Sequence, residues 1–398
     1  MTSIRKVNMS GPLVPFRAGF HEELERQGYT PLGAECQLRV MAHMSRWLES
    51  RRLGPGDLSS KRIEQFLRVR RREGYTLWLS PKGVAPLLAY LRGIGAVPMP
   101  DLAPTTPVDD FLATYRVYLL EERGIAVTSS VSYLHVARLF LNEHSDFHGV
   151  HIEGLTAANV VEFVSTQCGL RNPAHIVCGL RSLLRYCHLQ ELTAGSLVGA
   201  VPTVASWRLA SLPKTLEPAE LRMLFESCDR RTTFGRRDFA ILSVLARLGL
   251  RAGEVVALEL GDIDWRAGEL MVRGKGPRID RLPLPVDVGE AIADWLQQGR
   301  RSCECPNVFT RVRAPLSALT SSGVSNVVNA ACRRAGLPEV CAHRLRHSAA
   351  TEMLRAGSNL AEVGQVLRHR SLLTTSIYAK VDRSSLSAVA QPWPGGVA

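Results

Sequence analysis

Two segments in the second half of the chain combine residue types that bind phosphate or donate protons. In residues 249–254, Arg251 is followed three positions later by Glu254. That spacing is about one helical turn, so the carboxylate could orient the guanidinium. Lys275 lies between two glycines, which let a backbone approach another molecule closely. Taken alone, each segment is explained more simply by a surface ion pair or a solvated turn lysine.

Two further segments contain histidines. His343, Arg346 and His347 are spaced by three and four residues, so they share one face of a predicted helix. An imidazole beside a guanidinium can bind a phosphate and move a proton. His369 and Tyr378 follow, nine residues apart. Taken singly, these residues could equally be packed or solvated histidines and a tyrosine that serves packing.

Together the four segments supply what attack on a phosphodiester requires. The transition state needs positive charge at its equatorial oxygens, a nucleophile and a proton donor for the leaving oxygen. A tyrosine can be the nucleophile once its proton is withdrawn. No cofactor and no metal are predicted, because the chain lacks a GxxxxGK[ST] loop and the pair Cys303 and Cys305 has no second matching ligand pair.

Proline-rich or small-residue stretches divide the chain into three regions that must position these residues. Proline clusters do not continue helices, so the stretches at 96–107 and 195–213 are predicted to be linkers. The predicted domains are residues 1–100, residues 107–197 and residues 215–390.

The first two regions repeat one pattern of amphipathic helices. Residues 58–66 match residues 155–163, and residues 87–90 match residues 183–186. Both copies open with a Ser or Thr suited to cap a helix. Amphipathic helices resemble one another easily, but matches in the same order favour a duplicated helical bundle.

The third region differs because it mixes helices with strands. A strongly apolar helix is predicted at 238–250, and two short apolar runs at 269–284 flank a Gly-Lys-Gly-Pro turn typical of a β-hairpin. The predicted fold class is therefore mainly α with a small β-hairpin or sheet.

The charge balance points to a polyanionic partner. The 398 residues include 49 Lys and Arg against 37 Asp and Glu, a formal net charge of +12, which favours nucleic acid. Arg68, Arg70, Arg71 and Arg72 form a basic run suited to phosphate contacts, although a solvated helix face would look the same. No stretch approaches the roughly 20 apolar residues of a membrane span, so no membrane partner is expected. The nine scattered cysteines fit reduced thiols in a cytoplasmic protein.

Residues 215–383 resemble the catalytic domain of the tyrosine recombinase (phage integrase) family. The motifs occur in the family's order: Gly-Leu-Arg-x-x-Glu, a hairpin lysine, His-x-Leu-Arg-His, and a late His and Tyr with Thr-Thr-x-x-Tyr at the end. Residues 107–197 resemble the family's helical core-binding domain, which closes over DNA opposite the catalytic domain. Residues 1–100 lie outside the minimal pattern.

The resemblance implies a role for each motif position. Tyr378 would attack the scissile phosphate, leaving a 3′-phosphotyrosyl link and a free 5′ hydroxyl, and a second strand's 5′ hydroxyl would reverse the step. The other implied roles are a phosphate clamp by Arg251 and Arg346, support of the first arginine by Glu254, protonation of the leaving 5′ oxygen by Lys275, proton transfer at the tyrosine by His343, a phosphate hydrogen bond from His369, and a supporting place for His347.

One position departs from the family pattern. The family usually has Leu-Gly-His before the tyrosine, whereas this chain has Leu367, Arg368 and His369. The arginine needs room that a glycine does not, so the local geometry is expected to differ.

The implied partners are double-stranded DNA and further copies of the chain, assembled as a tetramer on two DNA sites. In the family, a segment such as residues 381–389 often docks on the adjacent subunit. Partner recombinases are a further class that the resemblance allows, and the expected location is the nucleoid. The long N-terminal addition favours an integrase or transposase of a mobile element. A type IB topoisomerase-like activity and a catalytically idle DNA-binding protein stay as alternatives.

Overall fold

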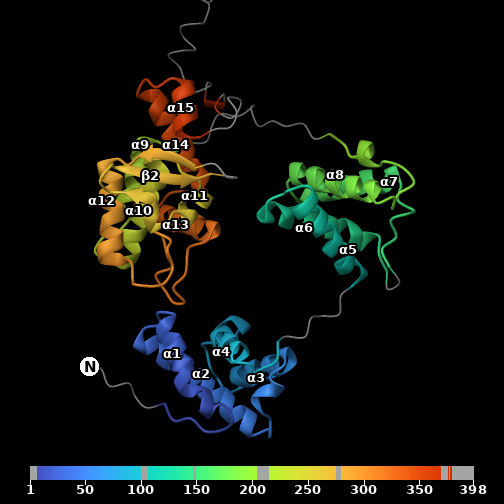
Figure 1. Cartoon of the computed structure of the whole chain (residues 1–398), viewed down its shortest axis with the longest axis vertical. Coiled ribbons are helices and arrows are strands. Elements are labelled where there is room, and N and C mark those ends of the chain that lie inside the picture. The colour runs from blue at the N-terminus through green and yellow to red at the C-terminus, as the bar shows by residue number, and fades with distance from the viewer. Residues whose placement is uncertain are drawn as a thin grey trace, which may run out of the picture. The chain divides into compact units, whose positions relative to one another are not determined.

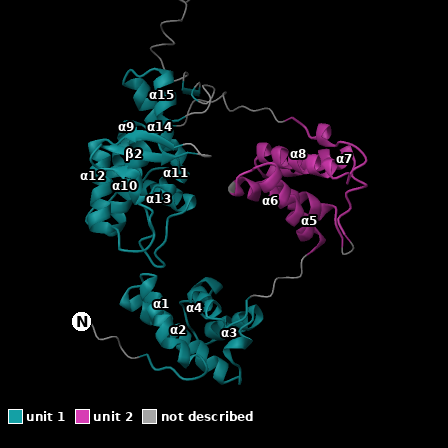
Figure 2. Ribbon diagram, in the orientation of Figure 1, with its two compact units in different colours: residues 1–99, 212–398 teal, residues 100–211 magenta. Residues whose placement is uncertain are grey.

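The structure of the chain is a computed structural model in which helices predominate. It describes residues 7–99, 106–146, 149–203, 215–274 and 279–368, with Thr375, Ile377 and Tyr378. Its strands form one small antiparallel sheet of order β1-β2-β3, which confirms the predicted fold class. The chain divides into two compact units, residues 1–99 with 212–398 and residues 100–211 (Figures 1 and 2). None of the described helices combines the length and apolarity needed to cross a membrane.

The N-terminal residues form a bundle of helices around their own apolar core. The elements are η1 (Val14–Phe16), α1 (Arg17–Arg26), α2 (Pro31–Glu49), η2 (Pro55–Asp57), α3 (Ser60–Arg72) and α4 (Pro81–Gly93). Prolines at the first turn start α2 and α4, where their missing N–H costs nothing. Met41, Phe66 and Leu87 are fully buried at the centre.

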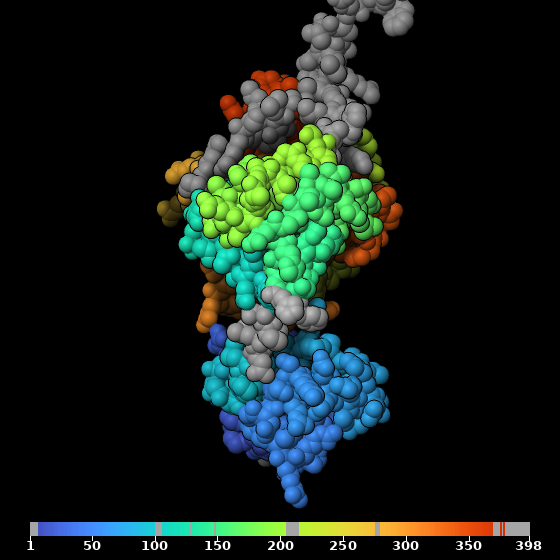
Figure 3. All heavy atoms as spheres, turned by 90° about the vertical axis from the view of Figure 1, so that its right-hand side faces the viewer, coloured from blue at the N-terminus to red at the C-terminus, as the bar shows by residue number. Residues whose placement is uncertain are grey.

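The second unit is a separate bundle with its own core. Its elements are α5 (Pro107–Val117), the π-helical turn η3 (Tyr118–Glu122), α6 (Val127–Glu143), α7 (Ala157–Leu170), α8 (Pro173–Leu189) and η4 (Val198–Ala200). Tyr115, Phe140 and Leu180 are fully buried in it. The atoms of the N-terminal helices (blue) and of this unit (green) each form a closely packed surface (Figure 3).

The last two helices of each bundle correspond at the spacing seen in the sequence. Helices α3 and α7 begin 97 residues apart, and α4 and α8 end 96 residues apart. Ser59 and Thr156 cap the equivalent helices through their side chains. Phe66 and Phe163 are both buried two turns later. This correspondence is what a duplication requires, and the duplication stays a prediction.

Residues from Pro218 onward form the mixed region. Its elements are α9 (Pro218–Glu226), α10 (Thr233–Arg247), α11 (Ala252–Ala257), η6 (Leu260–Asp262), β1 (Ile263–Asp264), β2 (Glu269–Arg273), β3 (Ile279–Pro283), α12 (Val286–Asp294), η7 (Trp295–Gly299), α13 (Ser321–Arg334), α14 (Ala342–Arg355) and α15 (Leu360–Val366). Strands β2 and β3 pair with Leu270 opposite Leu282, as the predicted hairpin requires.

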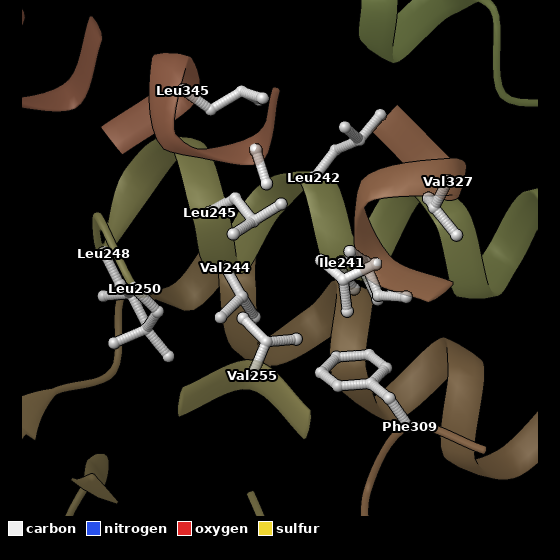
Figure 4. Packing of buried hydrophobic residues seen from close by; sticks show 14 of the residues in the cluster. Ile241, Leu242, Val244, Leu245, Leu248, Leu250, Val255, Phe309, Val327 and Leu345 are labelled. Carbon is white, nitrogen blue, oxygen red and sulfur yellow. The ribbon is translucent and has the colours of Figure 1, made fainter. Parts of the chain in front are cut away.

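Helix α10 is the centre of this region. It begins earlier than the apolar pattern predicted, because the Thr232 side chain accepts a hydrogen bond from the Gly235 N–H and caps it. Its apolar residues point in several directions into the core, as Figure 4 shows for Val244 and Leu245 beside Val255. A helix buried on this scale can hold the elements that carry the motifs in place.

The turn after α10 requires a glycine. Gly249 has a φ of +59°, a left-handed conformation that side chains rarely adopt. A Cβ at this position would lie 2.5 Å from Cδ2 of Leu367. The turn therefore sits directly against the end of α15, and both must keep their places for the motif residues to meet.

We expect Gly249→Ala to destabilise the chain by at least about 1 kcal/mol more than Gly268→Ala. Both glycines have a positive φ, but a Cβ at Gly268 would meet nothing within 4 Å. The control thus carries the backbone strain without the clash against Leu367. Chemical denaturation of the full chain measures the difference, and equal destabilisation by the two variants would contradict this account of the turn.

Candidate active site

Arg251 and Glu254 form a tight pair at the start of α11. Glu254 Oε1 accepts from Arg251 Nη1 at 2.6 Å, and Oε2 accepts from the Arg251 backbone N–H at 2.8 Å. Glu254 is buried, whereas the Arg251 side chain is 41% exposed. The carboxylate thus caps the helix and holds the guanidinium at the surface, where an anion could reach it.

Arg346 on α14 is the most deeply buried of the motif arginines. Its Nη1 donates to the carbonyl of Gly249 and its Nη2 to the carbonyl of Leu367. Its Nε is buried with no hydrogen-bond partner among the described residues. Burial, with the charge of Arg251, lowers the pKa of Arg346 to about 10, so the group stays positive at neutral pH.

His343 and His347 lie together one turn apart on the same helix. Their ring centroids are 4.4 Å apart in an edge-to-face arrangement. Burial lowers the pKa of His347 to about 4, and the charges of His343 and Arg346 act in the same direction. Burial also lowers the pKa of His343. Both rings are therefore neutral at pH 7 and able to accept a proton.

Tyr378 lies beside His347 at the edge of a small apolar cluster. Its Oη is 2.7 Å from His347 Nδ1, and its side chain is buried against Leu354 and Leu367. Burial raises the pKa of Tyr378 to about 12, and the charges of Arg346 and Arg251 only partly offset this. The phenol is therefore protonated at neutral pH and needs a base to become a nucleophile.

Sequence spacing did not reveal that His347 meets Tyr378. The two residues are 31 positions apart, and the resemblance assigned proton transfer at the tyrosine to His343. The only sequence signal was the placement of His347 one turn after His343 on a common helix face. The contact depends on tertiary packing that this signal does not contain.

Arg368 is a buried member of the same cluster. Its Nη2 donates to Glu254 Oε2 at 2.7 Å, so the carboxylate that holds Arg251 also holds Arg368. The sequence showed that this arginine needs room, and the structure provides it beside Glu254. Lys275 and His369 lie outside the described residues, as does the predicted segment at 381–389.

The arginine run on α3 separates into inward and outward side chains. Arg70 is 4% exposed, donates to His43 Nδ1 at 2.7 Å and packs its guanidinium over the Tyr75 ring. Arg71 is exposed and donates to the Leu79 carbonyl. Position 70 shares a helix face with Phe66, which explains its inward direction.

Arg68 and Arg72, the first and last arginines of the run, line a groove. Two arginines that do not belong to the run also line it. The groove has a volume of about 520 Å³. Its lining includes Arg51, Arg62, Arg68 and Arg72. Arg62 was not among the residues predicted from the sequence. Helical spacing of three and four residues along α3 places Arg62 on the same outward face as Arg72 and could have identified it. Across the part of the chain that the structure describes, no group of His, Cys, Asp or Glu could hold a metal ion.

Comparison with known proteins identifies the family of the chain. Residues 214–385 match the phage integrase family. A relative from Sinorhizobium fredii, "Putative integrase/recombinase y4rA", is 36% identical over 97% of this chain and 95% of its own length. Tyrosine recombinase XerC of Oceanobacillus iheyensis is 29% identical over 69% of this chain and 93% of its own. The chain belongs to the phage integrase family of tyrosine recombinases and is a DNA recombinase.

Solved structures show the same fold. The XerH site-specific recombinase bound to its difH substrate matches with a TM-score of 0.56 at 20% identity, covering 82% of this chain and 93% of that one. A lambda integrase dimer bound to a core site matches with a TM-score of 0.54 at 17% identity, covering 72% and 98%.

The neutral histidines predict how stability changes with pH. The folded-state pKa of His347 lies well below the unfolded value of about 6.5, so the unfolded chain takes up a proton first as the pH falls. Stability contributed by the neutral ring is therefore lost as the pH falls from about 6.5 towards 4.

We expect His347→Gln to lose less thermal stability between pH 7 and pH 4.5 than the unchanged chain. His188→Gln, at an exposed position on α8, is the control and should behave like the unchanged chain. Thermal unfolding at the two pH values measures the effect. An acid loss of the same size in all three proteins would contradict a depressed pKa at His347.

Proposed function

We propose that this recombinase cuts and rejoins DNA at specific sites through a 3′-phosphotyrosyl intermediate, with Tyr378 as the nucleophile. The observation that carries the proposal is the hydrogen bond between Tyr378 Oη and the neutral His347, next to Arg346 and within the field of Arg251. A nucleophile, a base and two fixed positive charges are the parts that phosphodiester attack needs.

The proposed step keeps atoms and charges in balance. The Tyr378 oxygen forms a bond to phosphorus while its proton passes to His347 Nδ1. The bond from phosphorus to the 5′ oxygen breaks, and that oxygen takes a proton from Lys275. Reversal by the 5′ hydroxyl of another strand conserves the bond energy. The assignment of Lys275, and of a phosphate contact from His369, rests on the family resemblance.

Phosphate binding would prepare the base. In the free protein, transfer from a phenol with a pKa of about 12 to an imidazole with a pKa of about 4 is unfavourable. A negative phosphodiester beside Arg346 would raise the pKa of His347. As the bond from the Tyr378 oxygen to phosphorus forms, that oxygen loses electron density and its proton becomes acidic enough to pass to the imidazole. His343, packed against His347, would share in this transfer.

The biological setting we propose is a mobile element, with a tetramer acting on two DNA sites. The relative y4rA carries the description integrase/recombinase, and an integrase of transposon Tn1549 shares the fold with a TM-score of 0.53. The proposed tetramer can include partner recombinases as well as copies of this chain. The position of the Tyr378 hydroxyl beside His347 favours a catalytic protein over an idle DNA-binding protein. A reaction that requires two paired DNA sites would distinguish recombination from topoisomerase-like relaxation.

A trapping experiment tests the nucleophile. Duplexes from candidate element ends, nicked near the cleavage point, release a short 5′ fragment and so trap the covalent complex. We expect a protein–DNA band on denaturing gels with the unchanged chain and with Tyr75→Phe, an exposed control tyrosine. Tyr378→Phe should bind the DNA and give no such band, because it lacks the attacking oxygen.

Two results would contradict the proposal. A covalent band that persists with Tyr378→Phe would place the nucleophile elsewhere. Specific binding without a covalent band in any protein would favour the idle DNA-binding alternative.

We further propose that the groove on α3 contacts the DNA backbone. Arg68 and Arg72 line it together with Arg51 and Arg62, and the groove is open to solvent along α3. At the spacing of 97 residues, the positions of the second bundle equivalent to Arg62, Arg68 and Arg72 hold Asn159, Ser165 and Gly169, which do not form such a basic face. The contacts of these arginines are weak: Arg62 donates to Gln65 at 3.2 Å, and Arg68 lies 4.0 Å from Glu64. Exchanging them for phosphate contacts therefore costs little.

This proposal predicts a change in salt dependence. Each phosphate contact contributes about 0.9 to the slope of log affinity against log salt concentration. The double variant Arg62→Gln, Arg72→Gln should therefore flatten the slope by about 1.8. Arg26→Gln, Arg39→Gln removes the same charge from exposed arginines paired with Glu23 and Glu35 and should leave the slope unchanged. Fluorescence anisotropy over a salt series measures it, and equal slopes in both doubles would contradict the proposal.

A further inference from the structure

Position 368 carries an arginine in a backbone conformation that favours glycine. Its φ is +54°, which crowds the Cβ of any L side chain. Most described residues with a positive φ are glycines at turns. A strained backbone conformation of this kind persists only where the surrounding contacts stabilise it. The contacts of the Arg368 side chain must therefore offset the strain.

The side chain of Arg368 points into the site and donates through both of its terminal nitrogens, while its Nε is buried with no hydrogen-bond partner among the described residues. Nη2 donates to Glu254 Oε2 at 2.7 Å, and Nη1 donates to the Val366 carbonyl at 3.1 Å. The side chain is 3% exposed. Its ion pair joins the end of α15 to α11, two elements that the sequence separates by more than a hundred residues.

Glu254 is consequently shared between two arginines. Oε1 faces the Arg251 guanidinium, while Oε2 accepts from the Arg251 backbone and from Arg368. Burial raises the pKa of Glu254, but the Arg251 backbone hydrogen bond and the charges of Arg368 and Arg251 outweigh it, so the carboxylate is ionised. With both arginines fixed on one carboxylate, neither can swing away without leaving a buried charge less well paired.

The shared carboxylate also changes the charge of the site. Arg251, Arg346 and Arg368 lie around one buried carboxylate. The charges of Arg251 and Arg368 act on Glu254 and also on Arg346. Without Arg368, Glu254 would cancel the charge of Arg251, and only Arg346 would be left to attract a phosphate. With Arg368 present, the negative charge of the ionised Glu254 is already balanced by a second arginine. More of the positive charge of Arg251 is therefore available to attract an anion.

We propose that Arg368 is a positioning residue for strand cleavage, acting through Glu254 on Arg251 and fixing the residue from which the chain continues to Tyr378. This inference rests on the proposed phosphotyrosyl function. Arg368 does not touch the reacting atoms. Its effect is to keep the Arg251 guanidinium in place and available to the phosphate while anchoring the chain just before His369.

Three substitutions separate charge, shape and strain. Arg368→Gly relieves the strain of the left-handed backbone and removes the ion pair. Arg368→Gln keeps most of the side-chain volume without the charge. Arg368→Lys keeps the charge without the planar guanidinium and its paired donors. Arg355→Gln on α14 is the control, since this half-exposed arginine pairs with Glu217 and Glu352 outside the site.

The measurement is the single-turnover rate of covalent complex formation on a nicked duplex, with DNA affinity measured in parallel. We expect Arg368→Gly and Arg368→Gln to slow cleavage by about tenfold or more, equivalent to about 1.4 kcal/mol of transition-state stabilisation. DNA affinity should change less than about threefold, and Arg368→Lys should recover part of the rate. Arg368→Gly should also unfold at a temperature no lower than Arg368→Gln, which separates the rate effect from misfolding.

A double-mutant cycle and a neutral substrate test the route through Glu254. Glu254→Gln combined with Arg368→Gln should lose less than the product of the two single effects. A methylphosphonate at the scissile position removes the negative charge of the phosphate. On that substrate the deficit of Arg368→Gln should shrink, whereas a purely structural defect would persist unchanged.

Three outcomes overturn the inference. They are cleavage at the unchanged rate by Arg368→Gly and Arg368→Gln, fully multiplicative effects with Glu254→Gln, and a deficit of Arg368→Gln that persists unchanged on the methylphosphonate substrate. Each is distinct from failure of the proposed function. If the unchanged chain forms no covalent complex on DNA that it binds specifically, the phosphotyrosyl mechanism fails, and the role of Arg368 in cleavage fails with it.

Discussion

The buried guanidinium of Arg346 is the interaction on which the rest of the site depends. It donates to the carbonyl of Gly249 and to that of Leu367, so one side chain joins the turn after α10 to the end of α15. A buried charge is costly unless its hydrogen bonds are satisfied, so both carbonyls must stay in place. That requirement positions Arg251 just after the first carbonyl and Arg368 just after the second.

The same constraint explains why the site suits an anion. The carboxylate of Glu254 serves both Arg251 and Arg368, and Arg346 relies on neutral carbonyls for its described partners. Positive charge therefore exceeds negative charge in a region of low dielectric, where burial first, and the positive charge second, lowers the pKa values of the neighbouring histidines. The negative charge of a phosphodiester would offset this excess of positive charge, next to the Tyr378 hydroxyl and the neutral His347.

Local spacing predicted the parts of the site that lie within one turn of a helix. Arg251 with Glu254 follows from a separation of three residues, and the β2–β3 hairpin follows from its turn residues. The contact of His347 with Tyr378 could not be predicted this way, because it depends on how α14 packs against a distant segment. Arg70 shows the converse, since a basic run looks uniform until the helix face occupied by Phe66 is known.

The most direct test of the central claim identifies the amino acid joined to DNA. The trapped complex would be digested with trypsin and nuclease, and the remaining nucleotide–peptide analysed by tandem mass spectrometry. The account predicts a nucleotide linked through its 3′ phosphate to Tyr378. A nucleotide on another residue, or a link through the 5′ phosphate, would contradict the arrangement in which Arg346 and His347 prepare Tyr378 for attack.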